Sequence, residues 1–277
     1  MTWLSSIFYS LISGLAEVLP VSATAHRIIM QSLLGEGKNH ILLQMFLHMG
    51  SLAGLFYCCN SAIVRLTRAR KLANTPKRKR KRPLDTHALM DIRFLITAAI
   101  PVIVAFFFYD RVSPMEENLV AVSAFLFLNG VVIYIPQYLP GSNRDSRSLS
   151  RLDALLMGLG GALSVVPGFS CLGTAVSVAS VRGADKKFSL EMALLLSIPV
   201  LIGMIAMDVL TIVAVGMGSI GFMQLVQYLF CGICAFGGTF LGIRVLRALI
   251  DEFNLAVFSF YCWGLALFTF IFYLTAA

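Results

Sequence analysis

Apolar residues follow one another along this chain in long runs that short polar stretches separate. Six runs consist mostly of apolar side chains and end at polar or charged ones; they cover about 41–59, 92–109, 119–139, 190–215, 222–243 and 255–276. A helix of about 20 apolar residues is long enough to cross the hydrocarbon layer of a bilayer, which is roughly 30 Å thick. The pattern therefore predicts six transmembrane helices.

Two further apolar regions, 3–34 and 152–181, are interrupted by small and helix-breaking residues. These are Gly14, Glu17, Pro20 and Ser22 in the first region, and Gly160, Gly161, Pro167, Gly168, Ser170 and Gly173 in the second. Backbone that is not helical persists at membrane depth only where protein buries it or water reaches it, so such breaks usually line a cavity. We expect two re-entrant broken hairpins around a polar cavity near the middle of the membrane.

Basic residues set the predicted orientation. Of the 22 basic residues, 10 lie between Arg65 and Arg82, a stretch without an acidic residue. The positive-inside rule places the loop that contains them, 60–91, in the cytoplasm. Counting spans from this loop puts both termini outside. The first hairpin then enters the membrane from outside and the second from the cytoplasm.

Hairpins that enter from opposite sides predict an inverted-topology repeat, with halves of about 1–118 and 119–277 in a single membrane domain, 1–277. The spacing supports this weakly, because similar segments begin 24 positions after Pro20 and 24 positions after Pro167. The predicted fold class is thus an all-α polytopic membrane protein with six transmembrane helices, two re-entrant broken hairpins and an inverted repeat.

Composition excludes a soluble enzyme. The 277 residues are 58% hydrophobic and 13% charged, about half the charged share of a typical soluble domain. The net charge of +8 originates in the stretch 65–82 of the 60–91 loop, because outside that stretch acidic residues slightly outnumber basic ones. We therefore expect no nucleic-acid partner, and a solvated loop that fixes topology and contacts anionic lipid headgroups.

The six cysteines lie almost entirely within apolar segments; they are Cys58, Cys59, Cys171, Cys231, Cys234 and Cys262. This placement is typical of small core residues. Cys231 and Cys234 have the C-x-x-C spacing of redox and metal sites, but no second pair or histidine is near them in sequence, so we expect neither role. No basic region precedes the first apolar stretch, and we do not expect a removable signal peptide.

Ionisable residues within or beside the apolar segments are the first candidates for chemistry; they are Glu17, His26, Arg27, His48, Glu191 and Asp208. A charge at the centre of a lone helix costs at least about 2.5 to 3.5 kcal/mol, so these groups require a cavity or a partner. Glu191 and Asp208 are compatible with positions near the headgroups or at a helix cap. His48 is compatible with a hydrogen-bonded packing residue or with a functional one.

The first break gathers a carboxylate, two hydroxyls and an imidazole around a proline, from Glu17, Ser22, Thr24 and His26. A helix resuming near Ser22 would direct free backbone N–H groups and its positive dipole end into the cavity, which suits an anion. The second break, 166–174, would do the same from the opposite leaflet, and both helix ends would then meet one phosphate group. The alternative is a pair of kinks that only let helices pack closely.

Several motifs resemble those of the undecaprenyl-diphosphate phosphatase family, also called the bacitracin-resistance phosphatases. The family motif E-G-L-T-E-F-L-P-V-S-S-x-G-H corresponds to Ser13 through His26, and P-G-x-S-R-S-G corresponds to Pro167 through Gly173. The family's H-x-G-[ST]-L-x-A is matched from His48 to Ala53, and R-x-x-A-x-x-F-S-F-L-L-x-I-P is echoed from Arg182 to Pro199. The similarity covers nearly the whole chain.

The resemblance implies a hydrolase of the bacterial inner membrane that converts a polyprenyl diphosphate, such as undecaprenyl diphosphate, to the monophosphate. This reaction recycles the lipid carrier of peptidoglycan biosynthesis and underlies bacitracin resistance. The implied catalytic residues are His26 and Glu17, and the implied phosphate-binding residues are Ser22, Thr24, Gly168, Ser170 and Gly173. Magnesium or calcium is the implied cofactor, with Glu17 as a ligand. Membrane lipids are expected neighbours, and a homodimer stays open.

Of the six polar positions to which the resemblance assigns chemistry, three are replaced, by Ser13, Ala23 and Cys171. An arginine binds a diphosphate through charge-assisted hydrogen bonds, whereas Cys171 in an apolar setting is neutral and cannot replace it. Arg27 is the nearest basic residue in sequence, but as the helical neighbour of His26 it should point about 100° away from it.

The replacements leave the function open between classes. A transporter or flippase of lipid phosphate or a small anion would use an inverted repeat without cleaving a bond. A scaffold that binds envelope enzymes through its basic loop is a third interpretation.

Overall fold

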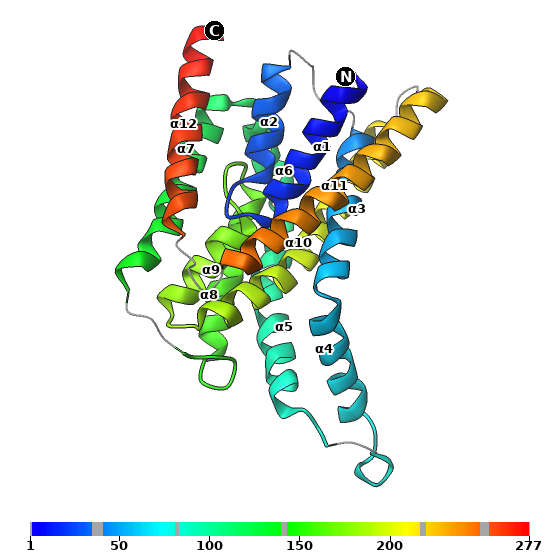
Figure 1. Ribbon diagram of the computed structural model, residues 1–277, viewed down its shortest axis with the longest axis vertical. Helices are drawn as coiled ribbons and strands as arrows, with labels where there is room; N and C mark the ends of the chain where they lie inside the picture. The colour runs from blue at the N-terminus through cyan, green and yellow to red at the C-terminus, as the bar shows by residue number, and fades with distance from the viewer. Residues whose placement is uncertain are drawn as a thin grey trace.

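The computed structural model describes residues 2–34, 41–80, 83–139, 143–216, 220–249 and 255–276. These residues form helices and their connections, with no β-strand among them (Figure 1). The α-helices are α1 (Trp3–Val18), α2 (Ala23–Leu33), α3 (Ile41–Cys58), α4 (Asn60–Ala73), α5 (Thr86–Phe106), α6 (Tyr109–Val112), α7 (Leu119–Tyr134), α8 (Arg151–Ala162), α9 (Cys171–Val181), α10 (Lys186–Val215), α11 (Phe222–Leu249) and α12 (Ala256–Ala276). Short 3-10 turns are η1 (Lys77–Lys79), η2 (Ser113–Glu117), η3 (Ile135–Tyr138) and η4 (Leu163–Val165).

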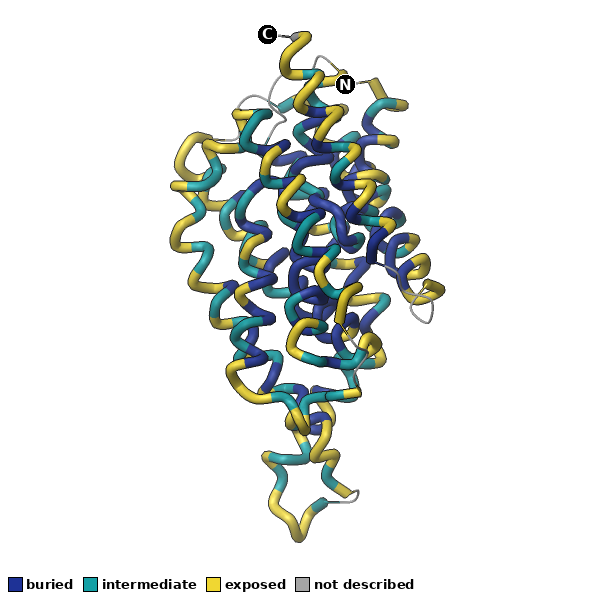
Figure 2. Tube along the Cα trace, turned by 90° about the vertical axis from the view of Figure 1, so that its left-hand side faces the viewer, coloured by how far each residue is buried: buried dark blue, intermediate teal, exposed yellow. Residues whose placement is uncertain are grey.

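The prediction of six membrane-spanning helices is confirmed. Within the described residues, six helical segments are long and apolar enough to cross a membrane: Ile41–Cys58, Thr86–Phe106, Leu119–Tyr138, Lys186–Val215, Phe222–Leu249 and Ala256–Thr275. Large apolar side chains cover their outer faces, and Figure 2 shows exposed residues along the outside of the bundle. This is the surface that lipid tails would cover.

Two boundaries differ from the predicted ones because polar turns at the helix ends remain helical. α5 begins six residues earlier than expected, at Thr86, where Asp85 caps it by accepting a hydrogen bond from the Ala88 N–H at 2.9 Å. α11 continues past 243 to Leu249.

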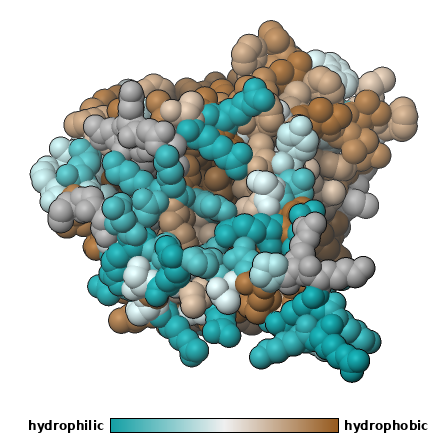
Figure 3. All heavy atoms as spheres, turned by 60° about the horizontal axis from the view of Figure 1, so that its bottom comes forward, coloured by the Kyte–Doolittle hydropathy of each residue, from teal (hydrophilic) through white to brown (hydrophobic). Residues whose placement is uncertain are grey.

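The basic segment 60–91 is more ordered than a solvated loop. Most of its first half is α4, which follows α3 directly and buries Leu66 and Ala69. Arg65 on α4 pairs with Asp91 on α5 at 2.6 Å, so the two helices extend together from the bundle (Figure 1). Figure 3 shows hydrophilic residues gathered on this end of the molecule. Two basic residues of the predicted loop, Lys81 and Arg82, lie outside the described residues.

Both interrupted regions consist of two short helices joined by a break. α1 ends at Val18 and α2 begins at Ala23. In the second region α8 ends at Ala162, η4 follows it to Val165, and α9 begins at Cys171. In Figure 1, α1 and α2 lie toward the end of the molecule where α12 ends, and α8 and α9 lie below them. The breaks fall in the interior of the bundle between these two pairs.

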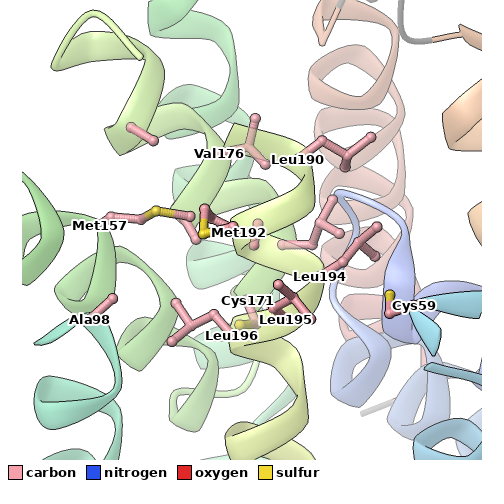
Figure 4. Close-up of a cluster of buried hydrophobic side chains, with 14 of the residues drawn as sticks. Cys59, Ala98, Met157, Cys171, Val176, Leu190, Met192, Leu194, Leu195 and Leu196 are labelled. Carbon is pink, nitrogen blue, oxygen red and sulfur yellow. The ribbon is translucent and has the colours of Figure 1, made fainter. Parts of the chain in front are cut away.

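Close helix contacts fix the position of each break. A Cβ atom placed on Gly14 of α1 would lie 2.1 Å from the carbonyl oxygen of Ala235 on α11, so only glycine permits this approach. Glu17 lies one turn further along α1. The second break rests on an apolar cluster around α9 and α10, where Cys171 lies beside Leu195 and Leu196 (Figure 4).

Candidate functional site

The two breaks are joined by hydrogen bonds from the serines at which α2 and α9 begin. Ser22 is the N-cap of α2: its Oγ accepts from the Ala25 N–H at 3.2 Å and also from the Gly168 N–H, in the other break, at 3.2 Å. Proline at position 20 has no N–H and stops α1, so the chain must restart at a cap. The first break therefore binds the second through the same oxygen that caps its helix.

The second break returns this contact. Ser170 is the N-cap of α9 and accepts from the Gly173 N–H at 3.2 Å, while its Oγ–H donates to the Leu19 carbonyl at 3.0 Å. Its own N–H donates to Asn129 Oδ1 on α7 at 2.9 Å. Gly168 has φ +114°, and a Cβ there would lie 2.6 Å from Cβ of Phe125. The predicted phosphate-binding residues of both breaks thus lie together, but their polar side-chain atoms bond mainly to protein.

A small cavity of about 20 Å³ lies against both breaks. Its polar lining comes from Glu17, Thr24, Arg27, His48, Ser164 and Ser170, and it is also lined by Ala23 and Cys171. Ala23, Thr24 and Cys171 belong to the first turns of α2 and α9. The N-terminal ends of two helices therefore border one polar space, as an anion site requires.

A second, larger cavity of about 580 Å³ adjoins α2. Its volume is in the range of pockets that hold small ligands. Thr24, Arg27, Ile28 and Gln31 line it from α2, and their spacing of three and four residues places them on one helix face. Facing residues are Ile41, Gln44, Tyr109, Ser113, Glu116 and Thr211, among others. Arg27 and Thr24 line both cavities.

Arg27 is the cation of this site. The residue is 6% exposed; its Nη1 donates to Glu17 Oε2 at 3.4 Å and its Nη2 to Thr24 Oγ1 at 3.2 Å. The buried Nε has no hydrogen-bond partner in the described part of the protein. A guanidinium carries five N–H donors, and two long hydrogen bonds leave most of them available to an anion.

His26 faces away from both cavities. Its Nδ1–H donates to the Ser22 carbonyl at 2.7 Å, and its Nε2 accepts from the Tyr261 hydroxyl on α12 at 2.7 Å. The two rings stack with centroids 5.6 Å apart. The helix rotation expected between positions 26 and 27 is thus present, but it is Arg27 that turns toward Glu17. The structure does not bring His26 and Glu17, the two predicted catalytic residues, into contact.

His48 and Asp208 form a buried pair. Nδ1 of His48 on α3 lies 2.7 Å from Oδ2 of Asp208 on α10, and the residues are 4% and 3% exposed. Asp208 lies within α10 and caps no helix. Glu191, in contrast, is exposed and lies 3.7 Å from Arg65.

The residues at the three replaced motif positions pack within the protein or line the small cavity. Ser13 donates from its Oγ to the Tyr9 carbonyl one turn earlier in α1, at 2.7 Å. Ala23 lines the small cavity without a polar group. Cys171 is 8% exposed and lies 3.7 Å from Ser197 Oγ. The other cysteines are also free thiols, in keeping with a packing role.

Carboxylates outnumber cations around the larger cavity. Arg27 interacts electrostatically with Glu17, Glu116 and Asp208. Burial raises the pKa of the Glu116 carboxyl, and the positive charge of Arg27 only partly opposes this. Among the described residues, no group of three or more His, Cys, Asp or Glu side chains is placed to hold a metal ion.

Sequence reasoning missed three features of the site. Glu116 belongs to a short acidic segment between two apolar runs, and Tyr261 is one of several hydroxyl side chains in an apolar helix. The third is the pairing of His48 with Asp208, because 160 residues separate them. Intramembrane charge was the available signal for this pair, since two such groups usually stabilise each other.

Comparison with known proteins places the chain in a family. The family model described as "Bacitracin resistance protein BacA" matches residues 6–268. An "Undecaprenyl-diphosphatase" of Methanobrevibacter smithii is 30% identical over 277 residues, which cover 98% of each chain. Proteins of the same name from Alkaliphilus metalliredigens (27% identity, 95% of this chain and 96% of that one) and, as "Undecaprenyl-diphosphatase 1", from Shouchella clausii (24% identity, 98% and 97%) are also similar over nearly their whole length. This chain therefore belongs to the BacA bacitracin-resistance family.

Proposed function

We propose that this protein is a membrane phosphatase that hydrolyses a polyprenyl diphosphate, in the first instance undecaprenyl diphosphate, to the monophosphate and inorganic phosphate. Membership of the BacA family and the name shared by its relatives support this substrate. In the inner membrane of a bacterium, the reaction would return the lipid carrier to peptidoglycan biosynthesis. The larger cavity, of about 580 Å³, would hold the diphosphate, and the isoprenoid tail would lie between helices.

The observation that carries the proposal is the position of Arg27. The family motif places an arginine where this chain has Cys171, and Arg27 lines the same small cavity as Cys171 from the opposite break. Its free N–H donors can make charge-assisted hydrogen bonds to phosphate oxygens, with the Thr24 hydroxyl beside them. The loss of the motif arginine therefore leaves the site with a cation.

A divalent cation is part of the proposal, as an ion that arrives with the diphosphate. The described residues offer no three-ligand protein site, but magnesium commonly uses one or two carboxylates together with substrate phosphates. Glu17 is the carboxylate that would hold it, and Glu116 is the next candidate. When bound, the ion would offset the negative charge that diphosphate and carboxylates share.

The proposed arrangement in the membrane follows the two pairs of short helices. α1–α2 would be a re-entrant hairpin from the outer side and α8–α9 one from the cytoplasm, related as inverted repeats, with both termini outside and the basic segment inside. Support comes from the reciprocal serine contacts, in which each N-cap bonds to the other break.

Release of inorganic phosphate tests the function. Purified protein in detergent would receive undecaprenyl diphosphate with magnesium or calcium, and with EDTA as the metal-free arm. We expect release that requires the ion and that falls at least about a hundredfold in Arg27→Ala. Arg93→Ala, which removes an exposed arginine of α5, is the matched control. Folded protein that binds the lipid without releasing phosphate would contradict the proposal and favour transport.

A further inference from the structure

The proposed function above assigns no role to the buried pair of His48 and Asp208. The two residues come from α3 and α10, and their side chains are 5% and 3% exposed. Ionisable groups are costly at membrane depth unless they pair or serve a function. A hydrogen bond of 2.7 Å joins Asp208 Oδ2 and His48 Nδ1. The second ring nitrogen of His48, Nε2, takes no part in this contact.

The contact determines which nitrogen of His48 can act as a base. A carboxylate accepts the hydrogen bond, so Nδ1 carries the proton and Nε2 presents a lone pair. The same carboxylate stabilises the imidazolium that forms when Nε2 takes up a proton, and it holds the ring in one orientation. This is the chemistry of a general base and a residue that positions it.

His48 borders the small cavity together with the residues proposed to bind phosphate. The cavity of about 20 Å³ has room for about one water molecule, which needs roughly 10 to 15 Å³ on this measure. His48, Glu17 and Ser170 supply polar groups around it. Arg27 and Thr24 line both this cavity and the larger one, so a phosphate held by them would border the water site.

We propose that His48 is the general base of the hydrolysis and that Asp208 is its positioning residue, an inference that rests on the proposed phosphatase function. Nε2 of His48 removes a proton from a water molecule in the small cavity while the water oxygen bonds to the terminal phosphorus. The bond between that phosphorus and the bridging oxygen breaks, which leaves the lipid monophosphate and inorganic phosphate. The proton on Nε2 then passes to the departing inorganic phosphate, and His48 returns to its neutral form.

His26 cannot serve in this way where it lies. Both of its ring nitrogens are engaged, with the Ser22 carbonyl and with the Tyr261 hydroxyl, and it borders neither of the two cavities that Arg27 lines. The family motif directs attention to His26, whereas the geometry of this chain assigns the base to His48.

Substitutions that keep the hydrogen bonds but remove the base test the proposal. In His48→Asn the amide can still donate to Asp208 but cannot accept a proton, and Asp208→Asn keeps an acceptor for Nδ1 but removes the charge. His87→Asn, at an exposed histidine of α5, is the matched control, and His26→Asn is measured beside these variants. Phosphate release from undecaprenyl diphosphate and affinity for the same lipid would be measured on folded, monodisperse protein.

We expect His48→Asn to lower kcat by about 10²- to 10⁴-fold with the lipid Kd nearly unchanged. Asp208→Asn should lower kcat by at least about tenfold at constant KM, because it removes an interaction made in the transition state. His87→Asn should stay within about threefold of the wild type. If His48→Asn does not fold, the kcat and KM of Asp208→Asn decide.

Two different outcomes overturn two different claims. Retention of kcat in His48→Asn or Asp208→Asn, or its loss in folded His26→Asn alone, would exclude His48 as the base while the protein remains a phosphatase. Absence of phosphate release from the wild type would instead remove the proposed function, and this inference with it.

Discussion

The two helix breaks are alike in backbone and unlike in charge. Each contains a proline, each restarts its helix at a capping serine, and each serine bonds to the opposite break. The first break carries Glu17 on its α1 side, and Thr24 and Arg27 in the helix that follows. The second opens α9 with Cys171 and Leu172, which lie in an apolar cluster. Both breaks thus contribute to the backbone framework of the site, whereas the charged side chains named here come from the first break.

This difference shows that the framework and the chemistry of the site are separable. Serine caps and backbone N–H groups hold the breaks together without using a charged side chain. Residues from the first turns of both helices line the small cavity. In the proposed site the cation is Arg27 on α2, and Cys171, where the resemblance to the family implies an arginine, lies in the apolar core.

Moving the charge back to the second break should have the largest effect. We expect Arg27→Leu to lower phosphate release at least about a hundredfold, and the double variant Arg27→Leu with Cys171→Arg not to recover it. The reason is space, because Cys171 borders a cavity of about 20 Å³ and packs against apolar neighbours. Phosphate release on folded protein measures this, and recovery to near wild-type rates would show that the two breaks are interchangeable.

The backbone of the second break should be the next most sensitive feature. Gly168 has φ +114° and no room for a Cβ atom, which would lie 2.6 Å from Phe125 Cβ and 2.8 Å from the Leu126 nitrogen. Gly168→Ala should therefore destabilise the protein by about 2 to 4 kcal/mol. Gly216 also has positive φ but open space around it, so Gly216→Ala isolates the conformational cost, about 1 kcal/mol. Thermal unfolding in detergent compares them, and equal losses would contradict the steric explanation.

Removing each capping serine in turn should show whether the two breaks contribute equally to stability. Ser22→Ala and Ser170→Ala each remove an N-cap and one hydrogen bond to the other break. We expect each to destabilise the fold by about 1 to 2 kcal/mol. Unfolding midpoints of the two single variants should be similar. A large loss for one and none for the other would mean that only one serine holds the breaks together.

The smallest expected effect concerns Glu116, which lines the larger cavity. Burial raises the pKa of the Glu116 carboxyl, the positive charge of Arg27 opposes this shift, and the negative charges of Asp208 and Glu117 add to it. Below this raised pKa the side chain is neutral and wild type should resemble Glu116→Gln. Above it, the wild type carries an extra negative charge that repels diphosphate, so Glu116→Gln should show a KM a few-fold lower, about 1 kcal/mol or less. KM measured across pH would reveal this, and a difference that shrinks as pH rises would have the wrong sign.

The sequence was sufficient for the number of spanning helices and for the position of both breaks. Runs of apolar residues fix the former, and Pro20 and Pro167 fix the latter because proline ends a helix. The orientation of residues 26 and 27 was correctly expected to differ, but sequence alone could not tell which one faces Glu17. That choice depends on α12, whose Tyr261 hydroxyl binds His26.

The parts of the site that could not be predicted depend on packing between distant segments. Asp208 and His48 meet because α3 packs on α10, and neither sequence neighbourhood reveals the other. The helical continuation of the basic segment as α4 was also missed, because Leu66 and Ala69 are buried only through its packing near α5. Local pattern identifies which residues are unusual in a membrane, and tertiary contacts determine their partners.

The most direct test of the account is the affinity for undecaprenyl diphosphate of Arg27→Gln and Cys171→Ala, measured side by side in lipid nanodiscs. If the first break holds the cation of the site, Arg27→Gln should weaken Kd by about 10- to 100-fold, the value of hydrogen bonds to a charged group, and Cys171→Ala should leave it unchanged. An unchanged Kd in folded Arg27→Gln would contradict the assignment of Arg27 as the phosphate-binding cation.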